Sequence, residues 1–381
     1  MAAAIMISRS VSPLNAGIGT IFIFALLTAA CAQPADSGDV FAPVLELHEA
    51  QENVGLALVL MKAGEVEVER YLGHALVEHD VPVSAQTRFQ VMSVTKAVIG
   101  AALIKTYSAG LVDLDAAIQT YLPDYPSPEN GEITLRRLAG HTAGLTHLNH
   151  PGRKAVYVEH FGSAQDSLTV FKDLPLVHEP GTAYSYSSAG YTLIAAVLEA
   201  VHEKPIQEVL DELIFEPLDL QTMAPGNVLA PTPNEARVYS YIDVWTYEPV
   251  EELQEVPTWD FSYNYGGGNL VTTANDLARF AAAFTEPGFF SVEELNMIYT
   301  KIDPEKSRWG FGWFVNETES GDKYLSISGA TPGVQAGVAA YPETDIVIVA
   351  IANSWGKNSA GGNLVIDAPQ AAVAAWGRQT E

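Results

Sequence analysis

Strand patterns at both ends of the chain, with helical patterns between them, constrain the fold more than any other sequence feature. Residues 54–71 form two strand patterns joined by a turn at 62–64. Four more strand patterns come late in the chain, at 310–315, 324–328, 335–341 and 345–352. Helical patterns are frequent between about 112 and 260. This order predicts an α/β protein of the α+β kind, with one sheet built from both termini, flanking helices and an inserted helical domain.

The domain limits follow from the same patterns. The fold should start near Phe41, with a sheet part covering 41–111 and 266–381 and a helical insertion at 112–265. A last helix is predicted at about 365–376. Of the 381 residues, 48% are hydrophobic, which is enough for a large buried core in one domain or two closely joined ones.

The N-terminus has the pattern of an export signal. Residues 17–30 form an apolar run that is short for a membrane span and typical of a signal-peptide core. We therefore expect a signal peptide at 1–30 and a linker at 31–40, with the mature protein in the periplasm or at its membrane surface.

Cys31, the only cysteine, follows the small residues Ala29 and Ala30 and resembles a lipoprotein cleavage site. The usual leucine is one position early, at Leu27, so cleavage after Ala32 by ordinary signal peptidase is the alternative. The first reading implies a membrane tether through a lipidated Cys31. Either reading leaves the mature chain without a disulfide.

Charge excludes several classes of partner. Acidic residues outnumber basic ones 46 to 20, giving a net charge of −26, and no run of lysine and arginine occurs. Nucleic-acid binding and polybasic membrane contact both need a basic surface, so neither is expected. His141, His147, His150 and His160 lack the spacing and carboxylate partner of a zinc site, and we predict neither a metal nor a cofactor.

The chemistry is indicated by an S-x-x-K motif, Ser93-Val94-Thr95-Lys96, which opens an apolar helical pattern at 93–107. Side chains at i and i+3 share a helix face, so Lys96 can reach the Ser93 hydroxyl. Lysine can take the proton of a serine nucleophile if burial lowers its pKa. The helix N-terminus supplies N–H groups for an oxyanion. A second S-x-x-K, at 354–357, follows a strand among glycines, and we interpret it as a chance match.

The context of Ser93 adds weight to the motif. The segment 82–96 resembles the one leading into the active-site helix of the class C β-lactamase-related serine hydrolase family. Further stretches resemble that family in the same order: 110–115, 121–123, 134–138, 141–145, 180–191, 267–273 and 341–353. The resemblance implies a serine β-lactamase/transpeptidase-like fold with an antiparallel sheet, and acyl transfer through Ser93.

The resemblance also assigns a second motif. Tyr186 falls where the family has the tyrosine of Y-x-N, a partner in proton transfer, while Tyr184 is a competing candidate. We expect Tyr186 and Lys96 to depress each other's pKa, so that either could hold the serine proton. Ser188 stands in place of the motif's asparagine, so it can bind Lys96 but offers no amide to a substrate.

The third motif, usually K-T-G or H-x-G, falls at Ile327-Ser328-Gly329. The resemblance implies that Gly329 is kept and that the N–H of Ala330 joins that of Ser93 in the oxyanion hole. Ile327 replaces the basic or imidazole residue that binds substrate carboxylates, and should add apolar surface to the pocket rim. Its loss counts against β-lactams and peptidoglycan termini as substrates.

These features favour an exported serine hydrolase acting on carboxylic esters or small amides. One alternative is D-alanyl-D-alanine carboxypeptidase or β-lactamase-like activity, and another is an inactive binding or regulatory homologue. The aromatic stretch 237–265 could either line the substrate site or form a separate small core under a loop. The sequence leaves the oligomeric state open.

Overall fold

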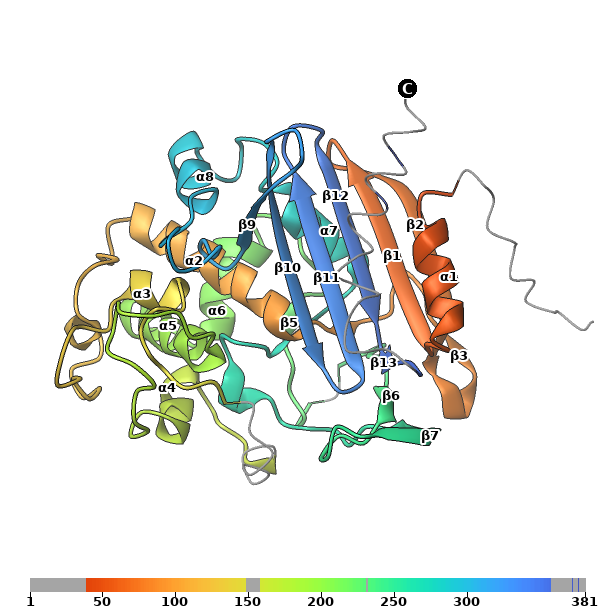
Figure 1. Ribbon diagram of the computed structural model, residues 1–381, viewed down its shortest axis with the longest axis horizontal. Coiled ribbons are helices and arrows are strands. Elements are labelled where there is room, and N and C mark those ends of the chain that lie inside the picture. The colour runs from red at the N-terminus through yellow and green to blue at the C-terminus, as the bar shows by residue number, and fades with distance from the viewer. Residues whose placement is uncertain (1–38, 149–157, 231, 358–371, 373–375, 377–381) are drawn as a thin grey trace, which may run out of the picture.

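A seven-stranded antiparallel sheet forms the centre of the protein (Figure 1). The computed structural model describes residues 39–148, 158–230 and 232–357, with Ala372 and Trp376. The strands lie in the order β3-β2-β1-β12-β11-β10-β9. Their bounds are β1 Gly55–Lys62, β2 Glu65–Leu76, β3 Val81–Pro82, β9 Phe314–Glu317, β10 Lys323–Thr331, β11 Val334–Tyr341 and β12 Ile346–Ala352. The predicted single sheet built from both ends of the chain is thus confirmed.

The two ends of the chain meet where β1 pairs with β12, with Leu56 opposite Ala352. Both strands are buried along nearly their whole length, because helices cover both faces of the sheet. Alternate residues of β1 point to opposite sides. Leu56, Leu58 and Leu60 pack with the segment that leads into α1 (Ala42–Ala50). Val59 belongs to the larger core that contains α2.

The larger core lies between the sheet and a group of helices, at the left of Figure 1. At its centre are α2 (Thr95–Ser108) and α5 (Ser188–His202), which are buried almost all round. The other helices are α3 Leu135–Ala139, α4 Ala164–Ser167, α6 Ile206–Leu210, α7 Ala274–Ala282 and α8 Val292–Ile298, with a π-helical turn at Asp211–Phe215. The single-turn 3-10 helices are η1 Val77–His79, η2 Met92–Val94, η3 Ile118–Thr120, η5 Leu168–Val170 and η7 Ser262–Asn264. The apolar pattern at 93–107 therefore folds as η2 followed directly by α2.

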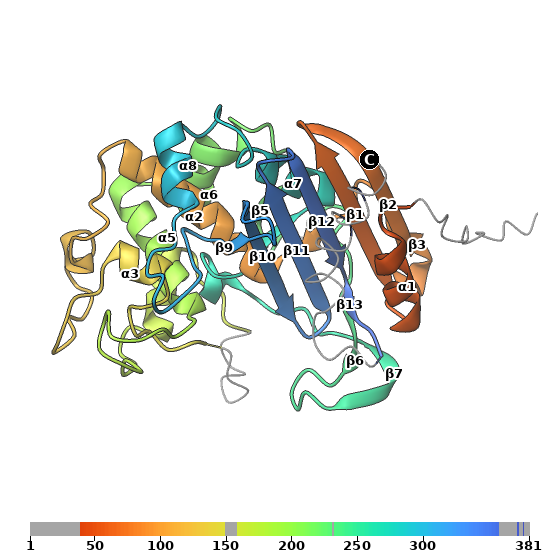
Figure 2. The same ribbon diagram turned by 45° about the horizontal axis from the view of Figure 1, so that its top comes forward.

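Two small three-stranded sheets accompany the main one. One has the order β4-β8-β5, with β4 Phe89–Gln90, β8 Leu270–Thr272 and β5 Ala224–Pro225. The other has the order β13-β6-β7, with β13 Ser354–Trp355, β6 Tyr239–Ile242 and β7 Pro249–Glu255. Figure 2 shows β6 and β7 extending below the main sheet. The inserted region is thus not purely helical, because β5, β6 and β7 fall within it.

Some sequence predictions differ from the structure or fall outside it. The strand predicted at 310–315 begins only at Phe314, because Gly312, at φ 85°, lies against the backbone of Lys96 in a turn. The predicted signal peptide, nearly all of the linker and most of the last helix lie outside the described residues. No helix in the described ranges is long and apolar enough to cross a membrane.

Candidate active site

Ser93 lies in η2, the single turn that leads into α2. The preceding residue, Met92, has φ 45°, a left-handed backbone that is strained for a side chain of this kind and characteristic of functional sites. The turn rests on Gly329 of β10: a Cβ there would come within 2.1 Å of the Val91 oxygen and 2.7 Å of the Ser93 nitrogen. Only glycine lets the strand approach the nucleophile this closely.

Lys96 lies beneath Ser93 and is completely buried. Its Nζ donates to Ser93 Oγ (3.1 Å), to Ser188 Oγ (3.0 Å) and to the carbonyl oxygen of Gly267. The spacing of the S-x-x-K motif thus brings the amine to the hydroxyl as predicted. Burial lowers the pKa of Lys96 below its ordinary value, as a lysine base requires.

Tyr186 approaches Ser93 from the other side, with its Oη 2.7 Å from Ser93 Oγ. Burial alone would raise the pKa of Tyr186, but the neighbouring charge of Lys96 and the hydrogen bonds to the phenol oxygen lower it. The expectation that Tyr186 and Lys96 lower each other's pKa is correct only for the pKa of Tyr186. Tyr186 acts to raise the pKa of Lys96, because a phenolate stabilises an ammonium, and burial is what lowers it.

Tyr184, the competing candidate, lies elsewhere. Its hydroxyl accepts a hydrogen bond from Trp309 Nε1 (3.1 Å), and the residue is 42% exposed. The structure therefore brings Tyr186, and not Tyr184, to Ser93.

Two histidines accept hydrogen bonds from the backbone at the start of α5. The N–H of Ser187 donates to His141 Nδ1 (3.1 Å) and that of Ser188 donates to His147 Nδ1 (3.3 Å). Burial and the nearby charge of Lys96 lower the pKa of His147 to about 4 and that of His141 well below its usual range. Both rings are therefore neutral at neutral pH. No group of three metal-ligating side chains occurs among the described residues, and His150 lies outside them.

A hollow of about 270 Å³ opens over Ser93. Of the predicted third motif, Ser328 lines this hollow together with Ala330. Ile327 does not: its side chain is 2% exposed and belongs to the hydrophobic core. The expectation that Ile327 adds apolar surface to the pocket rim is therefore wrong, because alternate residues of a strand face opposite sides and Ser328 has the outward position.

Asn264 is a residue of the hollow that the sequence analysis missed. Its amide lies beside Ser188: a Cβ on Gly267 would come within 2.1 Å of Asn264 Oδ1 and 2.7 Å of Ser188 Cβ. Because Oδ1 accepts a hydrogen bond from Thr192 Oγ1 (3.4 Å), the Nδ2 group remains as a donor. Asn264 thus brings an amide next to the position where the second motif lacks one. No sequence motif marks it.

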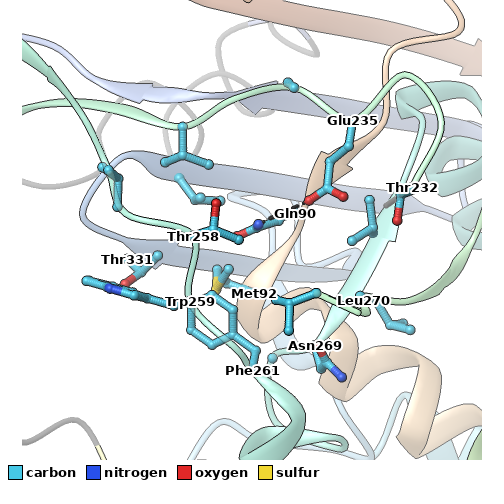
Figure 3. A pocket seen from close by; sticks show the side chains of 18 of the residues that line it. Gln90, Met92, Thr232, Glu235, Thr258, Trp259, Phe261, Asn269, Leu270 and Thr331 are labelled. Atoms are coloured by element: carbon cyan, nitrogen blue, oxygen red, sulfur yellow. Dashed lines mark hydrogen bonds between the residues drawn. The ribbon is translucent and has the colours of Figure 1, made fainter. Parts of the chain in front are cut away.

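The aromatic stretch 237–265 has one of its two expected roles, because part of it lines the candidate site. Tyr247, Phe261 and Tyr263 line the hollow over Ser93, whereas Tyr239 is buried in the fold. Next to the hollow lies a second cavity of about 360 Å³, shown in Figure 3, with Trp259 and Phe261 in its wall.

The second S-x-x-K forms no site. The Ser354 hydroxyl accepts from the N–H of Val54 (2.8 Å) and donates to Asn53 (3.2 Å). Lys357 instead pairs with Glu52 (3.0 Å). The motif is a chance match, as the sequence indicated.

Comparisons with known proteins agree with this architecture. The β-lactamase family model matches residues 41–370. The human protein "Serine beta-lactamase-like protein LACTB, mitochondrial" (Homo sapiens) is 25% identical over 347 residues, which cover 69% of this chain and 62% of that protein. The chain thus spans less than two thirds of the length of this relative.

Two solved structures show the same fold. D-amino acid amidase from Ochrobactrum anthropi SV3 superposes with a TM-score of 0.75 at 23% identity, covering 90% of this chain and 99% of that one. EstCE1, described as a hydrolase with promiscuous acyltransferase activity, gives 0.72 at 20% identity, covering 87% and 97%.

Proposed function

The chain belongs to the β-lactamase family, and from that premise we propose that it is a serine hydrolase that transfers an acyl group to Ser93 and then to water. The observation that carries the proposal is that Ser93 Oγ lies within hydrogen-bond distance of both Lys96 Nζ and Tyr186 Oη. A serine hydroxyl needs such a base to become a nucleophile.

The first half of the reaction forms the acyl-enzyme. Lys96 and Tyr186 act as a unit: whichever of them is deprotonated accepts the Ser93 proton as Oγ bonds to the substrate carbonyl carbon. The N–H groups of Ser93 and Ala330 stabilise the oxyanion. The position of β10 supports this role for Ala330. The pairing of β10 with β9 ends at Ser326, and the residues of β10 that follow lie against η2.

The second half releases the product. The tetrahedral intermediate collapses as the leaving group departs with a proton from Tyr186, the phenol nearest to Ser93 Oγ. Water then attacks the acyl carbon, gives its proton to the same pair, and the Ser93–acyl bond breaks to free the acid and restore the hydroxyl.

We infer that the substrates are carboxylic esters or small amides without a carboxylate beside the reacting carbonyl. Within the described residues, no lysine or arginine lines the hollow, and Lys96 beneath it is engaged by three acceptors. A net charge of −26 further disfavours anionic substrates. The D-amino acid amidase and the hydrolase EstCE1, which share this fold, accord with this chemistry.

A fluorophosphonate probe and an aryl acetate test the proposal. We expect stoichiometric labelling at Ser93, and turnover of the acetate that falls at least a thousandfold in Ser93→Ala. Retention of most activity by Ser93→Ala would refute the assignment of the nucleophile. Absence of both labelling and turnover would favour the non-catalytic alternative. A chromogenic cephalosporin hydrolysed with a higher kcat/KM than the ester would favour the β-lactamase-like one.

A further inference from the structure

The cavity beside the hollow shares part of its wall with the hollow over Ser93. Met92, Phe261, Gly268 and Thr331 line both spaces. Its volume of about 360 Å³ is within the range of about 300–1,000 Å³ that is usual for small-ligand pockets. The two spaces therefore adjoin at these four residues, and a substrate whose carbonyl lies at Ser93 would pass them to reach the cavity.

The position of Tyr186 decides which half of the substrate lies there. Under the proposed function, the leaving group must meet the Tyr186 hydroxyl to take up its proton. Tyr186, His147 and Trp309 line the hollow but not the cavity. The leaving group therefore lies on their side, and the acyl group extends the opposite way, into the cavity.

The cavity has a mixed lining of apolar and polar side chains, with one acidic group among them. Trp259, Phe261 and Leu270 supply apolar surface, as Figure 3 shows. On the side opposite Phe261, the Glu235 carboxylate points inward and accepts a hydrogen bond from Gln90 Nε2 through one oxygen (3.1 Å).

That carboxylate has no cationic partner. Within the described part of the chain, no basic side chain forms an ion pair with Glu235. Arg237 also lines the cavity, but it pairs with Glu255 (3.3 Å) and donates to Thr258 (3.3 Å). The second oxygen of Glu235 is therefore available to a ligand, and a partly buried carboxylate favours a cation.

We propose that this cavity binds the acyl chain of the substrate and that Glu235 recognises a cationic group at the far end of that chain. The inference rests on the proposed function, because it takes its direction from proton delivery by Tyr186. The substrate class is an ester or amide of an acid with an ammonium or similar cation several carbons from the carbonyl.

A pair of isosteric p-nitrophenyl esters tests the cation. One carries 6-(trimethylammonio)hexanoate and the other 7,7-dimethyloctanoate, which replaces the charged nitrogen by carbon. The readout is the ratio of their kcat/KM values, cationic over neutral. We expect this ratio to fall about fivefold in Glu235→Gln, since a partly exposed charge pair contributes modestly. Glu129→Gln, an equal change of net charge at an exposed site, should leave the ratio unaltered.

Binding to a nucleophile-free variant separates this inference from the proposed function. In Ser93→Ala, 6-(trimethylammonio)hexan-1-ol should bind more weakly, by a similar factor, when Glu235→Gln is added, as measured by calorimetry. An unchanged ratio and an unchanged Kd would overturn the role of Glu235 even if aryl acetate is hydrolysed through Ser93. Absence of acetate hydrolysis would instead refute the proposed function, and the Kd comparison alone would then decide whether the cavity binds a cation.

Discussion

Replacement of Lys96 by methionine should separate catalysis from stability. The Lys96 side chain is completely buried, and its amine donates to three oxygen atoms. If Lys96 belongs to the catalytic base, Lys96→Met should lower kcat/KM by at least a thousandfold, since general base catalysis contributes about 10²–10⁴ and Tyr186 loses the charge that lowers its pKa. Adding Ser93→Ala should cause little further loss, because the groups act as a unit.

The stability of the same variant should change little. The loss of the ammonium leaves two buried acceptors without this donor. The Gly267 carbonyl loses it at a cost of about 1–3 kcal/mol, whereas the Ser188 hydroxyl keeps its hydrogen bond with Tyr186. Removing a buried charge in favour of an apolar isostere offsets this by about 1–4 kcal/mol. We therefore expect a melting temperature within about 5 °C of wild type at pH 7.

The pH dependence of stability supplies a further check. Lys96 and Tyr186 both have lowered pKa values in the folded state, so each binds fewer protons there than in the unfolded chain as the pH approaches about 10. The contribution of these two groups to stability therefore rises with pH through this alkaline range in wild type. In Lys96→Met the lysine contribution is absent, so the wild type should gain stability relative to the variant between pH 7 and 9.5.

Denaturant titrations at both pH values and aryl acetate kinetics measure these effects, with the exposed Lys323→Met as the matched control. A Lys96→Met protein that is folded and retains more than about a tenth of wild-type kcat/KM would refute Lys96 as part of the base. A variant that fails to fold would instead show that its three hydrogen bonds outweigh the cost of the buried charge.

Four further outcomes are expected. Gly329→Ala should abolish acyl transfer and lower stability by about 1–3 kcal/mol, because its Cβ would come within 2.1 Å of the Val91 oxygen; full activity would contradict this packing. Asn264→Ala should lower kcat/KM for a small amide about tenfold through loss of one donor, and no effect would exclude substrate contact. Ile327→His should shift the ratio of cephalosporin to ester hydrolysis less than about threefold, since burial keeps an imidazole there neutral; a larger shift would show that position 327 reaches the substrate. We also propose that Cys31 is lipidated after export, so wild type should fractionate with membranes and Cys31→Ala should not; a soluble wild type beginning at residue 33 would contradict this.

The parts of the site that were predictable from sequence depend on local geometry. Ser93 and Lys96 lie one helical turn apart, so their contact follows from the spacing itself. Tyr186 was placed by the order of motifs along the chain, and its distance from Ser93 depends on how α5 packs against α2. The centre of the main sheet was predictable because β1, β11 and β12 are buried on both faces and therefore read as continuous apolar runs.

The parts that were not predictable depend on how loops meet in space. Asn264 reaches the hollow because Gly267 allows its amide to lie beside Ser188, a contact between segments more than 70 residues apart. The outward position of Ser328, and hence the burial of Ile327, depends on which face of β10 meets the core. The alternation of Leu325, Ser326, Ile327 and Ser328 along β10 fits this burial, whereas no pattern in the sequence marks Asn264.

The charges around the hollow over Ser93 and the adjoining cavity together explain why the third motif needs no cationic side chain. In a site that binds a carboxylate, a basic side chain must face the substrate, and its loss would leave that anion unpaired. Here the position of the basic residue is apolar and buried, and the acidic group that lines the adjoining cavity is the carboxylate of Glu235. The charge that these two spaces offer a ligand is thus opposite in sign to that of a carboxylate-binding site. The expected substrate is neutral near the carbonyl, and any charge at its acyl end is positive.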